Sequence, residues 1–87
     1  MDILEKFNLQ GRDSTFYYQF LGRLCSDCEY YLGNGGRCHG HLWTKDECDQ
    51  IELMRAIWKL LPEKPEWMTL EQINEYARRV LPQNLEV

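Results

Sequence analysis

The chain has 87 residues, the length of one domain, and 44% of them are hydrophobic, as in a folded globule rather than a disordered segment. Its 10 basic and 14 acidic residues give a net charge of -4, whereas domains that bind nucleic acid are usually basic. We therefore expect a single domain over residues 1–87 and do not expect nucleic acid as its partner.

No apolar run approaches the roughly 20 residues that cross a bilayer. The first residues, MDILEK, also lack the basic segment and following apolar stretch of a secretory signal. We accordingly expect a cytoplasmic protein with no membrane-spanning segment. In that compartment its four cysteines would remain reduced.

The first long helix is predicted over about residues 15–32, after a short helical arm or ordered leader within residues 1–13. Ser14 or Thr15 is a suitable N-cap for it. Apolar side chains at spacings of three and four form one stripe along this helix: Tyr17, Phe20, Leu21, Leu24, Cys28, Tyr31 and Leu32.

A cluster of glycine and asparagine at residues 33–36 is expected to end this helix, because these residues accept positive φ. The loop over residues 33–43 contains four glycines. It is longer than the usual connection between helices in a small bundle, which has about 2–8 residues. We therefore expect either that side chains hold this loop in place or that it moves.

The second helix is predicted over about residues 45–61. Thr44 and Glu47 have the spacing of a capping box, and Trp43 and Cys48 have the spacing of a hydrophobic staple. The apolar face is unusually wide, which predicts a central helix with two neighbours. That face comprises Ile51, Met54, Trp58 and Leu61, widened by Leu53, Ile57 and Leu60.

Pro62 and Pro65 are expected to end the second helix and to stiffen a linker over residues 62–68, which carries Trp67. An indole in such a linker either covers the end of a bundle or remains exposed as a contact for a partner.

The third helix is predicted over about residues 70–81. Thr69 and Gln72 form a second capping box, and Met68 and Ile73 occupy staple positions. Its stripe consists of Leu70, Ile73, Tyr76, Ala77 and Val80.

No stretch alternates as a β-strand does, and residues 83–87 are expected to fray. The predicted fold class is therefore all-α. It is a small three-helix bundle with a short N-terminal helix and a long Gly-rich loop between the first two main helices.

The four cysteines and two histidines allow a zinc hypothesis. Cys25, Cys28 and Cys38, completed by His41 or Cys48, supply the four ligands that zinc requires. The alternative is favoured, because Cys28 lies mid-stripe, where a thiol acts as a small buried hydrophobe. Zinc-binding C-x-x-C pairs also normally lie in a turn rather than in a patterned helix. We therefore expect no metal and no other cofactor.

Cys38 next to His39 suggests a nucleophile and its base. Adjacent residues seldom point toward each other, and the sequence indicates neither an orienting side chain nor an oxyanion donor. We therefore expect a protein that is not an enzyme.

Binding of a protein partner is the remaining function class. The candidate contact residues are Arg37, His41, Trp43 and Trp67, since exposed tryptophan next to a cation commonly carries interface energy. Arg37 and Trp43, with Lys45 and His39, also suggest a basic-aromatic patch for nucleic acid, which neighbouring acidic residues dilute.

Three strings carry a resemblance to a known family: DCEYYLGNG at residues 27–35, HLW at 41–43 and PEKPEW at 62–67, with Arg37 between them. The chain resembles the large polyvalent protein-associated domain family, small helical type eleven, over roughly residues 16–76. This resemblance implies an accessory protein of a phage or conjugative element, without established enzymatic activity.

Within that resemblance Cys28 and His41 match the family pattern, whereas Cys25, Cys38 and Cys48 do not belong to it. Gly36 stands where the family usually carries Asn. His41 and Trp43 would then hold the long loop across the first two helices. The expected function is a non-enzymatic accessory module that binds a protein partner. The alternative is a zinc-stabilised module that binds nucleic acid.

Overall fold

The computed structural model describes residues 2–33 and 37–81. It contains α1 (Ile3–Lys6), α2 (Ser14–Gly33), the 3-10 turn η1 (His39–His41), α3 (Glu47–Leu60) and α4 (Leu70–Val80), and the described residues contain no strand. The predicted all-α fold, with three main helices and a short N-terminal one, is confirmed. No helix in this part of the chain is both long and apolar enough to cross a membrane.

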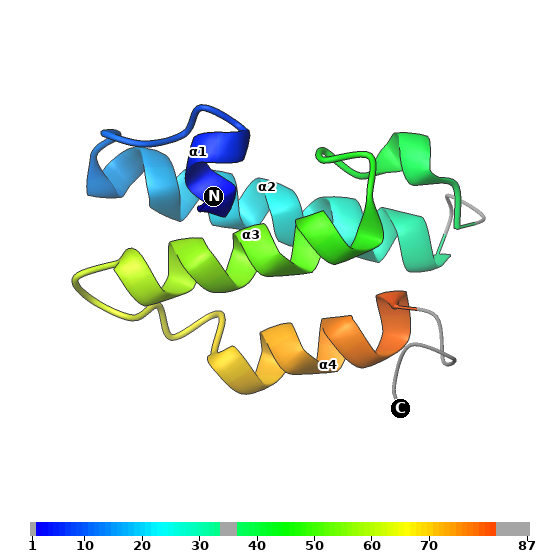
Figure 1. The fold of residues 1–87 in the computed structure, drawn as a ribbon. Coiled ribbons are helices and arrows are strands. Elements are labelled where there is room, and N and C mark those ends of the chain that lie inside the picture. Colours follow the sequence, from blue (N-terminus) through cyan, green and yellow to red (C-terminus); the bar gives the residue numbers. More distant parts are fainter. Residues whose placement is uncertain (1, 34–36, 82–87) are drawn as a thin grey trace.

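The three main helices run side by side, and α3 contacts α1, α2 and α4 (Figure 1). This central position explains the wide apolar face that the sequence places on α3, because the helix is buried from several directions. Its buried residues are Gln50, Ile51, Leu53, Met54 and Ile57. From the neighbouring helices α2 contributes Leu21, Leu24 and Cys28, and α4 contributes Ile73, Ala77 and Val80.

The segment before α2 is part of the core. Ile3 and Leu9 are both buried, and the Tyr17 hydroxyl donates to the Leu9 carbonyl over 2.6 Å. Lys6 forms an ion pair of 2.7 Å with Asp49 of α3. The short N-terminal arm is therefore packed against the bundle rather than extended from it.

The start of α3 differs from the prediction. Asp46, not Thr44, is the N-cap, and its carboxylate accepts from the Asp49 backbone N–H over 2.9 Å. The predicted capping box of Thr44 and Glu47 is therefore wrong, because the helix begins at Glu47 and the Asp46 carboxylate directly before it accepts from a free N–H of the first turn. The staple of Trp43 with Cys48 is wrong as well, since Cys48 is exposed.

The start of α4 agrees with the prediction. Thr69 is the N-cap, its hydroxyl accepts from the Gln72 N–H, and the Gln72 side chain accepts from the Thr69 N–H. Met68 and Ile73 at the staple positions are both buried.

At the C-terminal end of α3, Leu60 is exposed although the sequence places it in the apolar face. The expected fraying of residues 83–87 and most of the glycine cluster, at residues 34–36, lie outside the described residues.

Candidate functional site

A group of polar side chains holds the loop before α3 onto α2. The Tyr31 hydroxyl of α2 donates to Glu47 Oε2 over 2.6 Å, and His39 Nε2 lies 2.9 Å from the same oxygen. The Arg37 backbone N–H donates to the Tyr31 carbonyl over 3.1 Å. The Arg37 guanidinium also lies 5.8 Å from the centre of the Tyr31 ring. Burial raises the pKa of Tyr31, and the hydrogen bond to Glu47 makes a smaller contribution in the same direction.

We expect Tyr31→Phe to lower the free energy of unfolding by about 2 kcal/mol. The substitution keeps the ring and removes a short hydrogen bond to a carboxylate, which typically contributes roughly 1.5–3 kcal/mol. Urea denaturation measures the change. Tyr30→Phe, at an exposed position next to it, is the control and should change stability by less than about 0.5 kcal/mol. Equal effects of the two substitutions would contradict this role of the Tyr31 hydroxyl.

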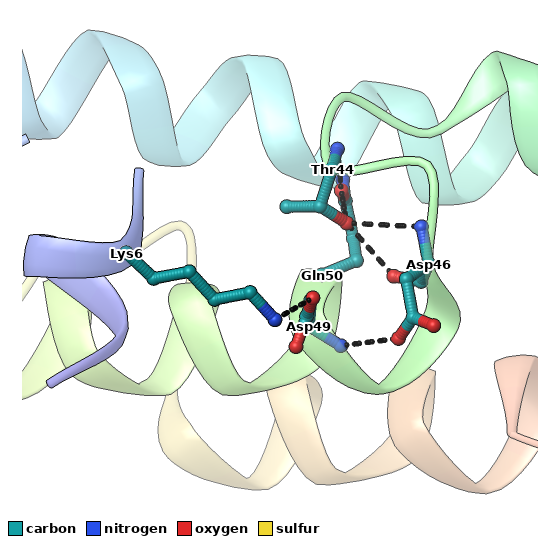
Figure 2. A network of polar contacts seen from close by, with 5 residues as sticks. All are labelled: Lys6, Thr44, Asp46, Asp49 and Gln50. Carbon is teal, nitrogen blue, oxygen red and sulfur yellow. Dashed lines mark hydrogen bonds and ion pairs between the residues drawn. The ribbon is translucent and has the colours of Figure 1, made fainter. Parts of the chain in front are cut away.

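Gln50 is a buried polar residue that connects the loop, α2 and α3 (Figure 2). Its side-chain N–H donates to the Leu24 carbonyl over 3.1 Å. Its side-chain oxygen accepts from the Thr44 backbone N–H and from the Thr44 hydroxyl, each over 3.2 Å. These contacts satisfy the buried amide, which therefore serves the fold and is not available for a ligand.

Arg37, His41 and Trp43, three of the predicted contact residues, lie in this loop. Trp43 is half-buried, and its ring centre is 5.4 Å from that of Phe7 and 4.8 Å from that of Phe20. His41 is exposed, and its ring meets that of Tyr30 edge to face at 4.6 Å. Arg37 is exposed as well. The contacts of these residues hold the loop against α1 and α2.

Trp67, the fourth predicted contact residue, lies elsewhere. The loop with Trp43 precedes α3 and the linker with Trp67 follows it, so the two lie at opposite ends of that helix (Figure 1). The structure therefore does not combine the four predicted residues into one surface. The Trp67 side chain is 50% exposed, more than the other large hydrophobic residues that are exposed in the described part of the chain, which are Tyr30 and Leu60.

The linker that carries Trp67 is held by Lys64. Its ammonium group donates to the carbonyls of Trp58, Lys59 and Leu61 over 2.8–2.9 Å, and it lies 4.8 Å from the centre of the Trp58 ring. These carbonyls belong to the C-terminal end of α3, where cations are favoured because the helix dipole is negative there.

Two hydrogen bonds and a buried proline also hold the same linker. The Trp58 indole N–H donates to the Met68 carbonyl over 3.0 Å, and the Tyr18 hydroxyl donates to the Glu63 carbonyl. Pro65 is buried. The backbone on both sides of Trp67 is thus held in place.

The cysteines do not gather into a metal site. Cys25 and Cys28 are buried in α2, whereas Cys38 and Cys48 are exposed. Nowhere within residues 2–33 and 37–81 do three or more His, Cys, Asp or Glu side chains form a group that could hold a metal ion. The alternative zinc set of Cys25, Cys28, Cys38 and His41 is therefore not assembled.

Burial also opposes the thiolate form that metal binding requires. It raises the pKa of both Cys25 and Cys28 to about 12, with a smaller contribution from Glu29 at Cys25 and from the Cys25 thiol at Cys28. The Cys28 thiol lies 3.7 Å from the Met54 sulfur, a core contact. His39, the candidate base for Cys38, is paired with Glu47.

Two shallow depressions of about 180 and 220 Å³ lie on the described surface. Each is lined by a single helix, α4 in the first case and α2 in the second. Both are below the roughly 300–1,000 Å³ of typical ligand pockets. Neither of these two depressions is deep enough to enclose a small molecule.

Sequence reasoning missed Gln50 and Lys64, which hold the loop and the linker, and it assigned Glu47 to a capping box rather than to its contacts with Tyr31 and His39. Lys64 had a usable signal, because a lysine shortly after a helix end can reach the last carbonyls. Gln50 had none, since its partners Leu24 and Thr44 come together only in the fold.

A family model described as large polyvalent protein-associated domain 11 matches residues 14–80, which span α2, η1, α3 and α4. Searches among curated proteins and among solved structures each found no match.

Proposed function

Because the chain belongs to the large polyvalent protein-associated domain 11 family, we propose that it is a non-enzymatic accessory module of a phage or conjugative element and that it binds a partner protein. The description of this family associates the domain with large polyvalent proteins. The proposed contact surface is the one around Trp67.

The single observation that carries the proposal is the half-exposed Trp67 indole on a firmly held linker. An exposed tryptophan costs solvation free energy in the isolated chain, and tryptophan is among the residues that contribute most to binding energy at interfaces. Since Lys64, Trp58 and Tyr18 already fix the linker, a partner would lose little affinity to ordering it.

The distribution of reactive groups supports binding over catalysis. The thiols of Cys25 and Cys28 are buried, and Glu47 is engaged by Tyr31 and His39. These side chains stabilise the fold where they lie, which leaves the surface aromatic residues as the groups best placed to act on another molecule.

Affinity capture from a lysate of the natural host tests this function. We expect the intact chain to retain a discrete protein, and we expect Trp67→Ala to retain at least about tenfold less of it, as is typical of a residue that dominates an interface. Tyr30→Ala removes another exposed aromatic side chain, on α2, and is the matched control. The proposal would be wrong if no protein is retained and the purified chain binds duplex DNA tightly instead.

A further inference from the structure

We propose that the partner segment received by Trp67 is basic and presents arginine to the indole. This inference rests on the proposed function, because it names the chemistry of the partner at the same surface. We call this surface the Trp67 surface and define it as Trp67 with the exposed residues Glu63, Glu66 and Glu71.

The segment that carries Trp67 is rich in exposed carboxylates, with Glu63 and Glu66 before the tryptophan and Glu71 after it. Within the described part of the chain, Glu63, Glu66 and Glu71 form no ion pair with Lys, Arg or His. Residues 61–71 contain one cation, Lys64, and its ammonium group is taken up by the carbonyls at the end of α3. An approaching molecule therefore meets carboxylates without counterions, which attract a cationic segment and repel the phosphates of nucleic acid.

Arginine fits this surface better than lysine. A guanidinium group is planar, so it can stack on the indole face and at the same time donate hydrogen bonds to a neighbouring carboxylate. It is also less strongly hydrated than an ammonium group, so bringing it against the ring costs less. Tryptophan is the most favourable aromatic acceptor for a cation.

The described part of the chain already contains this type of contact at four positions. Lys64 lies 4.8 Å from the centre of the Trp58 ring, and Arg12 lies 5.2 Å from that of Phe16. Lys6 lies 5.6 Å from the centre of the Phe7 ring, and Arg37 lies 5.8 Å from that of Tyr31. No cation of the described chain lies over Trp67, although its side chain is half-exposed and its neighbours are acidic. The Trp67 surface has the ring and the carboxylates of such a contact, and the partner would supply the cation.

The test is a titration of the full chain with short amidated peptides, followed through the indole N–H signals in NMR spectra. The probes are a peptide of alternating leucine and arginine, the same peptide with lysine for arginine, and the same peptide with glutamine for arginine. Trp67→Phe identifies the signal of Trp67. We expect the arginine peptide to shift this signal and to bind about tenfold more tightly than the glutamine peptide, with the lysine peptide between them.

Matched charge variants separate a local effect from a general one. Glu63→Gln combined with Glu66→Gln should weaken binding of the arginine peptide about three- to tenfold at low salt. Glu5→Gln combined with Glu52→Gln changes the net charge equally at exposed positions on α1 and α3, and should leave binding within about twofold. Equal weakening by both pairs would overturn the assignment to the Trp67 surface.

Three further results would overturn the inference. The first is that the glutamine peptide binds as tightly as the arginine peptide. Binding would then depend on an apolar contact with Trp67 and not on a cation, and the proposed function would still stand. The second is that no peptide shifts the Trp67 signal. The third is that sedimentation equilibrium shows self-association that Trp67→Ala abolishes, which makes a second copy of the chain the occupant. Capture of a host protein would remain a separate test of the proposed function.

Discussion

Gln50→Leu is expected to lower the free energy of unfolding by about 2–3 kcal/mol, although it places an apolar side chain of similar size in an apolar core. Gln50 is fully buried and joins the loop at Thr44 to the α2 carbonyl of Leu24. Leucine leaves the buried Thr44 N–H without an acceptor, and an unsatisfied buried donor costs roughly 1–3 kcal/mol. Urea denaturation with a fixed m-value measures the loss.

Two related substitutions make this prediction specific. Glu52→Gln, at an exposed position on the same helix, should change stability by less than about 0.5 kcal/mol. Gln50→Glu should destabilise more than leucine at neutral pH, because a carboxylate cannot donate to Leu24, and should recover partly at acid pH, where it is protonated. A stability of Gln50→Leu within about 0.5 kcal/mol of the unaltered chain would contradict the role of this amide.

The second large effect concerns the cysteines. In the folded protein, iodoacetamide should modify Cys38 and Cys48 and leave Cys25 and Cys28 unmodified. Only thiolates react, and raising the pKa of a thiol from 9.0 to about 12 lowers its thiolate fraction near neutral pH about 1,000-fold, before access is considered. Mass spectrometry of peptides after timed alkylation measures each rate. All four cysteines should react in guanidinium chloride, and fast modification of Cys28 without unfolding would show that its core contact is wrong.

Because Cys28 is buried as a neutral thiol, the free energy of unfolding should fall at alkaline pH. The folded pKa of Cys28 lies above its ordinary value of 9.0, so the folded state holds the proton more firmly than the unfolded state does. The contribution of this thiol to stability is therefore fully present below about pH 9 and is lost as the pH rises toward about 12, by about 1.4 kcal/mol at most for each pH unit. Urea midpoints on both sides of pH 9 should show this decline.

The helices could be predicted from the sequence because their signals are local. The stripe that contains Leu21, Leu24 and Cys28 lies on the buried side of α2, and the cap formed by Thr69 and Gln72 is present. Each signal lies within a few residues, where spacing alone determines which side chains meet.

The start of α3 was not predictable in the same way, because two caps compete there. Asp46 is the better N-cap by residue type, whereas Thr44 has the capping-box spacing with Glu47, so the two local signals disagree. Asp46 caps the helix, whereas Thr44 bonds to Gln50, a contact that requires the loop to have folded back. The local rule was therefore overridden by an arrangement that forms only in the complete fold.

The candidate site was predictable only in part. Trp43 and Trp67 both look like contact residues in the sequence, yet Trp43 is packed between Phe7, directly after α1, and Phe20 of α2. The exposure of Trp67 follows from how Lys64 and Trp58 fix the linker, and these contacts span the end of α3. Whether an aromatic side chain is covered depends on long-range packing, which spacing does not encode.

The packed N-terminal arm has a consequence for the boundaries of the cooperative unit. The family match begins at residue 14, but Ile3 and Leu9 are buried in the core, and Phe7 covers one side of Trp43. A fragment cut at the edge of the match would uncover that indole and remove the salt link between Lys6 and Asp49. The segment that packs into the common core is thus longer than the segment that matches the family model.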